Sequence, residues 1–284
     1  MTEPVIHLSD VSFDYPPLVV DGAPIPVFAG LSLAVEAGDF VGVVGPNGAG
    51  KTTLLLILAG LAPRLTHGRL RGEVHVRGRA GMVFQEIEGQ LFNPTVEAEI
   101  AWGLENLGLP LAEIERRLEW ALAAMGLKAC RFAPPGELSG GQQKRVALAA
   151  TLAMQPDILL LDEPTAGLDP VGRQDVLAAL ADLRRVYPVT VVMAENDAET
   201  VARFARRVVV LHAGRAVRDA TPQAVFREIS FLDEIGAPVP PAARLAAMLR
   251  GAGHPADFLT LEQAREALAR WQRGDGTTRA GGSA

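Results

Sequence analysis

The residues with the clearest chemical meaning form the stretch GPNGAGKT, Gly45 to Thr52, which follows the apolar run FVGVV and precedes the helix-forming run TTLLLILAG. The spacing fits Gly-x-x-x-x-Gly-Lys-Ser/Thr, in which glycines let backbone N–H groups approach phosphate oxygens and the helix start adds its positive dipole end. Lys51 is expected to reach the β- and γ-phosphates, and the Thr52 hydroxyl to ligate Mg²⁺. The candidate nucleotide-binding residues are Gly45, Pro46, Asn47, Gly48, Ala49, Gly50, Lys51, Thr52 and Thr53.

A second candidate site lies at the end of LLLDEP, residues 159–164, where Asp162 and Glu163 follow an apolar run. In an open parallel sheet, ligands bind at the carboxyl edge, so these acids are expected at the ligand. Asp162 is expected to hold Mg²⁺ through water, and Glu163 to polarise the attacking water as general base. Taken alone, the pair could equally be two solvated acids that end a strand; a phosphate loop in the same chain favours the catalytic interpretation.

A third candidate is LSGGQQKR, residues 138–145. Ser139 can cap a helix, and Gly140 and Gly141 expose its first N–H groups, which would make a second anion-binding helix start. One nucleotide needs only one such loop, so the chain either binds two ligands or offers the second loop to a partner's nucleotide. From the spacing alone, an ordinary capped surface helix is the simpler interpretation.

Strand-like and helical stretches alternate along much of the chain, and they must position these residues. Nearly unbroken apolar runs, typical of parallel strands covered on both faces, occupy 40–45, 157–164 and 189–197. Helical patterns occupy 52–60, 142–154 and 173–186. This alternation predicts an α/β fold with a parallel sheet at its core.

Smaller units are expected around that core. Short strands, turns and glycines over 5–44 and 69–84 predict a small antiparallel β subdomain, and 97–127 is expected to be helical, with LAEIERRLEWALAAMG as its clearest amphipathic piece. The pattern changes after about residue 220. Residues 221–273 predict a short α-rich C-terminal extension, and 274–284 predict a disordered tail.

Two helix starts can be placed in the extension. Thr221 followed by Pro222 provides a cap and a first-turn proline. Thr260 and Gln263 stand at the spacing of a capping box.

Composition excludes several classes of protein. The chain has 284 residues, 49% hydrophobic and 21% charged, which is typical of a globular protein with a sizeable core. The formal net charge of −6 argues against a nucleic-acid partner. The single cysteine, Cys130, rules out an internal disulfide and fits a reducing cytosol. The N-terminus does not read as a signal peptide, and no apolar run approaches the roughly 18 residues of a membrane span.

Four stretches, GPNGAGKT, LSGGQQ, ILLLDEP and AGLD, in this order and spacing, resemble the ATP-binding cassette (ABC) superfamily over about residues 5–220. The resemblance implies a P-loop ATPase cassette at 1–220 with a helical subdomain at about 86–155. In that family two cassettes pack head to tail, and each ATP lies between one phosphate loop and the partner's signature helix, which accounts for the second anion-binding loop. The signature residues are then Ser139, Gly140, Gly141 and Gln142.

Further site residues follow from the resemblance alone. Gln85 resembles the glutamine that meets Mg²⁺ and the attacking water, and Asp169 the aspartate at the dimer seam. Tyr15 resembles the aromatic residue stacked on adenine, with Phe13 as the alternative and a plain surface tyrosine as the competing interpretation. The implied cofactors are ATP and Mg²⁺, and the residues of the metal site are Thr52, Gln85 and Asp162.

Residues 85–110, QEIEGQLFNPTVEAEIAWGLENLGLP, are similar to the same region of energy-coupling factor (ECF) transporter ATPases, whose C-terminal extension the chain also resembles. Such ATPases power import of vitamins or of cobalt and nickel ions, together with a transmembrane coupling subunit and a substrate-capturing membrane subunit. The resemblance implies a peripheral position on the cytoplasmic face of the membrane and a groove for a helix of the membrane partner. Leu91, Phe92 and Trp102 suit such a contact, although core packing explains them equally well.

The stretch VTVVMAEND, residues 189–197, resembles the strand that leads to the family's switch histidine, usually written Thr-His-Asp or Glu-His-Asp. Glu195 and Asp197 match, and Asn196 replaces the histidine. An asparagine amide can donate a hydrogen bond to the γ-phosphate but cannot carry a proton at neutral pH. Asn196 is therefore a candidate catalytic residue with altered chemistry. The competing interpretation is a loop asparagine that caps the following helix.

Three functions compete. The favoured one is a transport ATPase that pairs with itself or with a second ATPase cassette. A soluble ABC protein in translation or DNA repair is disfavoured, because such proteins usually join two cassettes in one chain or carry a long coiled coil. A catalytically weak regulatory cassette is suggested only by Asn196.

Overall fold

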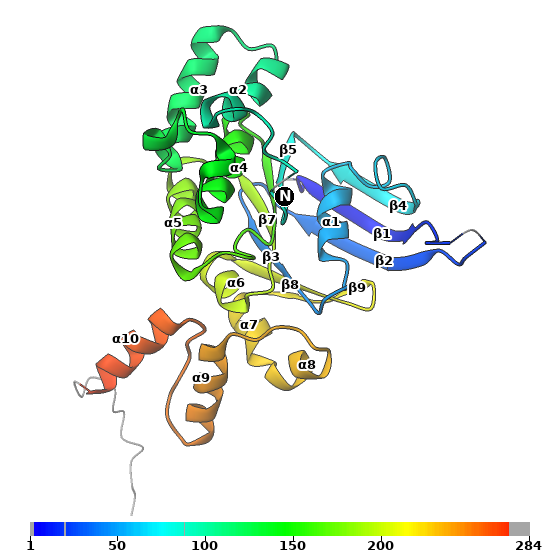
Figure 1. Cartoon of the computed structure of the whole chain (residues 1–284). Helices are drawn as coiled ribbons and strands as arrows, with labels where there is room; N and C mark the ends of the chain where they lie inside the picture. Colours follow the sequence, from blue (N-terminus) through cyan, green and yellow to red (C-terminus); the bar gives the residue numbers. More distant parts are fainter. Residues whose placement is uncertain (1–2, 20, 88, 273–284) are drawn as a thin grey trace, which may run out of the picture.

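The computed structural model describes residues 3–19, 21–87 and 89–272, of which 183–186 as backbone only. Its strands form two sheets, one of six strands and one of three. Helices cover the larger sheet, and a group of short helices follows at the C-terminal end (Figure 1). The disordered tail expected at 274–284 lies outside the described residues.

The larger sheet has the strand order β5-β6-β7-β3-β8-β9. Its strands are β3 (Phe40–Val44), β5 (Ala80–Val83), β6 (Ile158–Asp162), β7 (Thr190–Ala194), β8 (Arg207–His212) and β9 (Arg215–Ala220). Strands β5, β6, β7, β3 and β8 run parallel, and β9 returns antiparallel to β8. Every residue of β3, β6 and β7 is buried, which explains their unbroken apolar sequences. The predicted α/β fold with a parallel core is confirmed.

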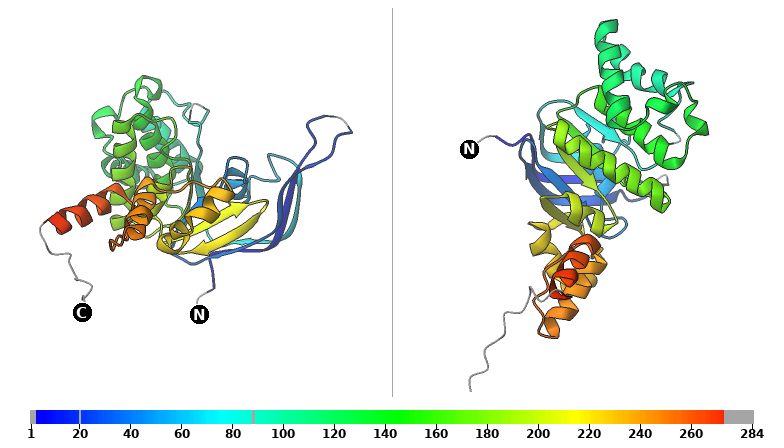
Figure 2. Two further views of the ribbon diagram at one scale, coloured as in Figure 1. Left: turned by 90° about the horizontal axis from the view of Figure 1, so that it is seen from below. Right: turned by 90° about the vertical axis from the view of Figure 1, so that its left-hand side faces the viewer.

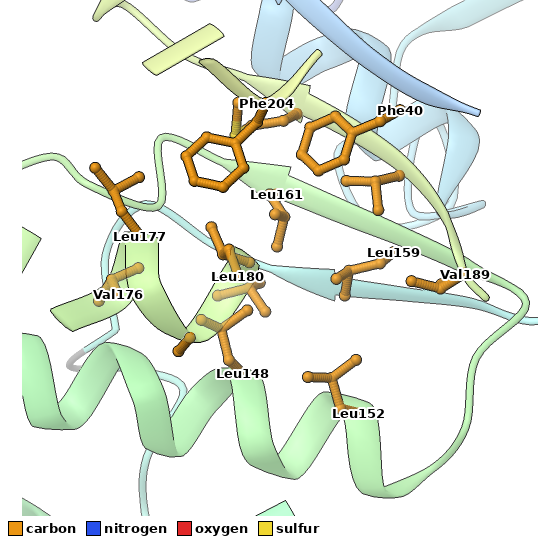
Figure 3. Close-up of a cluster of buried hydrophobic side chains, with 14 of the residues drawn as sticks. Phe40, Leu148, Leu152, Leu159, Leu161, Val176, Leu177, Leu180, Val189 and Phe204 are labelled. Atoms are coloured by element: carbon orange, nitrogen blue, oxygen red, sulfur yellow. The ribbon is translucent and has the colours of Figure 1, made fainter. Parts of the chain in front are cut away.

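Successive residues of the central strands pack into two cores on opposite faces of this sheet. The helices that cover it are α1 (Lys51–Leu58), α4 (Gly140–Ala153), α5 (Pro170–Val186) and α6 (Ala198–Phe204). Leu159 and Leu161 of β6 pack in the core that α4, α5 and α6 cover (Figure 3). The intervening Ile158 and Leu160 pack in the other core, with α1 and the smaller sheet. The sheet is therefore buried on both faces, and its strand ends are fixed in space.

The smaller sheet is antiparallel, as expected, with the order β2-β1-β4. Its strands are β1 (Ile6–Tyr15), β2 (Ile25–Val35) and β4 (Arg69–Val76). It lies beside α1, and its β1–β2 connection projects away from the rest of the molecule (Figures 1 and 2). Phe13 is fully buried in the core beneath this sheet, while Tyr15, at the end of β1, stays half-buried.

The helical subdomain consists of α2 (Val96–Asn106), α3 (Leu111–Ala124), the short 3₁₀ turns η1 (Lys128–Cys130) and η2 (Pro135–Glu137), and the start of α4. The stretch expected to be helical over 97–127 is thus two helices, interrupted where Gly108 adopts a positive φ of 68° ahead of Pro110. Arg131 binds Glu97 at 2.5 Å and Glu115 at 3.0 Å, and also binds Glu119. This network ties α2 and α3 to the segment after η1.

The C-terminal extension contains α7 (Pro222–Arg227), α8 (Ile229–Glu234), α9 (Pro241–Gly251) and α10 (Leu261–Gln272). The Thr221 hydroxyl caps α7 by accepting the Ala224 N–H at 3.3 Å, as predicted. Thr260 accepts the Gln263 N–H at 3.3 Å, but the Gln263 side chain accepts the N–H of Leu259 rather than that of Thr260, so the capping box closes one residue early. Among the described helices, none is long and apolar enough to span a membrane.

Candidate nucleotide and metal site

The phosphate loop sits between β3 and α1, at the carboxyl edge of the larger sheet. Gly45, Gly48 and Gly50 have φ values of 156°, 80° and 94°. A Cβ on Gly45 would lie 2.3 Å from the carbonyl oxygen of Leu211, so the chain can pass there only as glycine. Helix α1 has no side-chain cap at Gly50, which leaves the N–H groups of its first turn available to an anion. The predicted loop thus has the backbone geometry of a phosphate cradle.

Lys51 is buried within this loop. Its Nζ donates hydrogen bonds to the carbonyl oxygens of Gly45 at 3.0 Å and Pro46 at 3.2 Å. Burial lowers the pKa of Lys51, while the nearby carboxylates, Glu163 first, act in the opposite direction. Among the described residues, the hydrogen-bond partners of the Lys51 ammonium are therefore neutral carbonyl oxygens. A phosphate would offer it a full opposite charge.

Two of the predicted metal residues are in contact, and the third lines the same cavity. The Thr52 hydroxyl donates to Oδ1 of Asp162 at 3.1 Å, and both residues line one cavity together with Gln85. Burial raises the pKa of Asp162, against the opposing effects of the Thr52 hydrogen bond and of Lys144 and Lys51. A buried carboxylate bonded to a hydroxyl, with an amide side chain lining the same cavity, offers hard oxygen donors, which suit Mg²⁺. These three residues fit the metal that the family implies.

Glu163 and Asn196 are in contact. The Asn196 Nδ2 donates to Oε1 of Glu163 at 2.6 Å, which joins the carboxyl end of β6 to that of β7. Glu163 has a positive φ of 45°, a strained conformation for a residue other than glycine. Asp197, not Asn196, caps α6, by accepting the Glu199 N–H at 3.1 Å. The interpretation of Asn196 as a helix cap is therefore wrong.

Glu195 is a buried acid that binds the backbone of Asn196, a role that the sequence pattern did not indicate. It is 2% exposed and accepts the Thr165 hydroxyl at 2.9 Å and the Asn196 N–H at 3.0 Å. Burial raises the pKa of Glu195, opposed by these hydrogen bonds. The signal that could have found it is an acid directly after a fully buried strand, where a side chain must turn inward or out to solvent.

Tyr15 reaches the phosphate-loop helix. Its hydroxyl lies 3.1 Å from Oγ1 of Thr53, and its ring packs edge-on against that of Phe13 with centroids 4.9 Å apart. Phe13, the alternative adenine platform, is fully buried and offers no free face. Tyr15 is thus fixed beside α1 with its ring partly accessible, which agrees with an adenine contact.

The signature stretch forms the start of α4, as the sequence predicts. The Ser139 hydroxyl accepts the Gln142 N–H at 3.3 Å, and the Gln142 side chain accepts the Ser139 N–H at 3.0 Å, so a capping box closes. Ser139 and Gly140 are exposed. Asp169, also exposed, caps α5 by accepting the Gly172 N–H at 2.7 Å. The chain therefore presents both features at its surface, where a second cassette could contact them.

The cavity beside the metal residues, which we call the Gln-loop groove, has a volume of about 630 Å³ and extends from Thr52 and Asp162 to Phe92 and Trp102. Phe92 and Trp102 are 62% and 47% exposed, and their rings meet edge-on with centroids 5.0 Å apart. Core packing is therefore wrong as an explanation for these two aromatic residues, whereas Leu91 does pack partly on the core.

Buried Glu99 of α2 holds the loop that carries Phe92. Its Oε2 accepts the N–H of Phe92 at 3.0 Å and that of Asn93 at 2.7 Å. The sequence pattern gave no reason to single out this acid among the charges of a helix. Its contacts fix the wall of the Gln-loop groove to the helical subdomain.

Comparison with known proteins identifies the family of this chain. Residues 28–166 match the family described as ABC transporter. The chain is 39% identical over 282 residues to the energy-coupling factor transporter ATP-binding protein EcfA of Methanothermobacter thermautotrophicus, covering 95% of this chain and 88% of that protein. It is 38% identical over 283 residues to EcfA1 of Caldanaerobacter subterraneus subsp. tengcongensis, covering 94% and 99%.

Among solved structures, the fold resembles that of cbiO1 from Clostridium perfringens, described as part of the ABC transporter complex cbiONQ. The TM-score is 0.70, with 28% identity over 82% of this chain and 95% of that one. The chain therefore belongs to the ABC transporter family, as an ATPase whose hydrolysis of ATP is coupled to transport and which is akin to the energy-coupling factor ATP-binding proteins.

Proposed function

We propose that the chain is the ATP-hydrolysing subunit of an ECF-type importer that takes up a vitamin or cobalt and nickel ions. The observation that carries the proposal is the Gln-loop groove, which is lined by Thr52, Gln85 and Asp162 and also by the exposed aromatic residues Phe92 and Trp102. A helix seated in such a groove touches the residues that hold the metal. The proposed binding site of the membrane partner and the proposed site of hydrolysis then have lining residues in common.

The partners are a second cassette, identical or different, and two membrane proteins: a transmembrane coupling subunit and a substrate-binding subunit. The exposed signature start at Ser139 and Gly140, and the exposed cap Asp169, support the head-to-tail pairing of cassettes. The chain then works at the cytoplasmic face of the membrane. A soluble role in translation or DNA repair is disfavoured by the similarity to transporter ATP-binding proteins.

In this proposal the chain's own groups divide the work. The phosphate-loop N–H groups and Lys51 bind the phosphates, and Tyr15 stacks on adenine. Thr52, Asp162 and Gln85 would hold Mg²⁺, which would supply positive charge against the charge that develops on the phosphates. Glu163 orients and deprotonates the attacking water, and Asn196 holds that carboxylate from the neighbouring strand end at 2.6 Å.

Asn196 also supports a second candidate function, that of a cassette with low ATP turnover paired with a more active one. Its amide can donate to Glu163 or to a γ-phosphate, but it cannot change its charge as an imidazole can. Turnover that is low for this chain alone and normal with a neighbouring, histidine-bearing ATPase would identify the asymmetric pair.

The proposal is tested by co-expressing the chain with the polytopic membrane proteins encoded beside it and reconstituting the complex in vesicles. We expect ATP-dependent uptake of one substrate from the vitamin and Co²⁺/Ni²⁺ classes. Lys51→Ala is the matched inactive control, because it removes the main charge that neutralises the phosphates. A complex that forms and hydrolyses ATP, but takes up no member of these classes, would contradict the ECF assignment and leave the ATPase intact.

A further inference from the structure

A buried lysine near the site has no role in the mechanism above. Lys144, on the first turns of α4, is 3% exposed. Its Nζ donates a short hydrogen bond to the carbonyl oxygen of Gln85 and a longer one, at 3.4 Å, to that of Phe84. Burying an ammonium is costly unless it is paired and hydrogen-bonded, so a lysine held at this depth by neutral carbonyls calls for an explanation.

The surroundings of Lys144 supply part of the charge balance. Burial lowers the pKa of Lys144, and Glu195, Asp162 and Glu163 act on it from a longer range in the opposite direction. The carboxyl ends of β6 and β7 thus carry three acids, and both Lys51 and Lys144 interact electrostatically with them. In the proposed mechanism Lys51 binds the phosphates, which leaves Lys144 to offset the charge of these acids.

The position of Lys144 joins two parts of the molecule. Its helix, α4, begins at the signature stretch with Ser139 as cap, and later residues of the same helix line the Gln-loop groove. The carbonyls that it binds belong to the loop after β5 that carries Gln85, whose own side chain is exposed. Lys144 therefore restrains Gln85 through its backbone carbonyl.

We propose that Lys144 is a positioning residue, whose ammonium clamps the backbone of Phe84 and Gln85 so that the Gln85 amide is held toward Thr52 and Asp162. The inference rests on the proposed function, since it concerns how that site would hold Mg²⁺. With its side chain buried, Lys144 acts through the backbone that carries Gln85.

The test uses the full chain and a fluorescent, non-hydrolysable ATP analogue titrated at increasing Mg²⁺. Lys144→Met keeps the apolar stem and removes the donor; we expect the half-saturating Mg²⁺ concentration to rise by roughly tenfold, as is usual when a group that supports a metal ligand is lost. Amide hydrogen exchange over 84–92 should rise in the same variant. Lys144→Arg, which keeps a cationic donor, should recover most of both effects.

Arg145 provides the matched control. It is the next residue of α4, and it also donates to a backbone carbonyl, that of Met125 at 3.1 Å, and to Asp175 at 3.2 Å, away from the Gln85 loop. Arg145→Met should lower the melting temperature without changing the Mg²⁺ dependence. A shift of equal size in both variants would mean that Lys144 acts only through general stability, and would overturn the proposal.

A folded Lys144→Met protein with unchanged Mg²⁺ dependence and unchanged exchange over 84–92 would also overturn it. If Lys144→Met does not fold, Lys144→Gln is read by the same two measurements, because its neutral amide can still fill the space. The failure of the proposed function looks different: the reconstituted complex would then take up no vitamin, Co²⁺ or Ni²⁺, while the Mg²⁺ dependence of the chain and of its position-144 variants would stay as expected here.

Discussion

The 2.6 Å contact between Asn196 and Glu163 places a neutral amide against the candidate general base. A side-chain amide at this point orients the carboxylate but does not titrate between pH 5 and 8, as an imidazole does. In the proposed mechanism, Glu163 is the group that accepts a proton from the attacking water, and Asn196 orients its carboxylate.

The first prediction concerns Glu163→Gln, which keeps the shape of the side chain and removes the proton acceptor. ATP should still bind, and turnover should fall by roughly 10²–10⁴-fold. Phosphate release measures turnover, and size-exclusion chromatography should show an accumulated ATP-bound dimer. Near-normal turnover in this variant would remove Glu163 from the role of general base.

The second prediction concerns Asn196. Asn196→Ala should lower turnover with little loss of stability, because the amide is exposed and is not the cap of α6. Asn196→His should raise turnover and add a dependence on pH near the ordinary imidazole pKa, about 6.5. Steady-state rates and thermal melts of the three proteins decide the matter. Equal rates in all three would show that position 196 takes no part in hydrolysis.

At the scale of elements, α6 is held at its start by one side chain. Asp197 accepts the Glu199 N–H at 3.1 Å, the Thr200 hydroxyl at 2.9 Å and Nη1 of Arg173 at 3.0 Å. The bond with Arg173 joins the start of α6 to α5, the helix that begins after Asp169. A backbone N–H at the other end of the chain, that of Leu261, binds Glu199 at 2.8 Å.

The third prediction follows from these bonds. Asp197→Ala should reduce the free energy of unfolding by roughly 1 kcal/mol or more, since a helix cap and a partly exposed ion pair are lost together. Urea denaturation measures this effect. The matched comparison is Asn196→Ala, one residue earlier, which should leave the unfolding midpoint nearly unchanged; the reverse order of effects would restore Asn196 as the cap.

The predictability of the elements varies for physical reasons. Strands β3, β6 and β7 could be placed from sequence, because burial on both faces imposes an unbroken apolar run. The phosphate loop could be placed because few sequences give that turn. Two contacts could not be predicted from sequence: the hydrogen bond between Tyr15 and Thr53, and the hydrogen bond from the Phe92 N–H to Glu99. Each joins residues from separate elements, and tertiary packing sets how closely those elements approach.

At the scale of the whole molecule, three sites with different partners are built on one sheet edge and one helix. Lys51, Asp162 and Glu163 lie at the carboxyl edge, where we propose that the chain binds its own ATP, and the start of α4 carries the signature that we assign to a second cassette. The far part of α4 lines the Gln-loop groove, which we assign to the membrane partner. Helix α4 thus links two of the three proposed sites.

The last prediction tests that groove in the assembled complex. Phe92→Glu together with Trp102→Glu should reduce co-purification with the transmembrane subunit by more than about tenfold, since buried aromatic anchors usually dominate such contacts. Both side chains are largely exposed in the isolated chain, so its folding and ATP binding should be preserved.

Phe132→Glu is the control for this prediction, because Phe132 is 74% exposed, is also aromatic and lies in the same subdomain, but does not line the groove. It should leave co-purification unchanged. Undiminished co-purification of the double variant would move the docking site elsewhere on the cassette. An equal loss with Phe132→Glu would show that added negative charge anywhere on this subdomain repels the partner, in which case the groove has no special part in the contact.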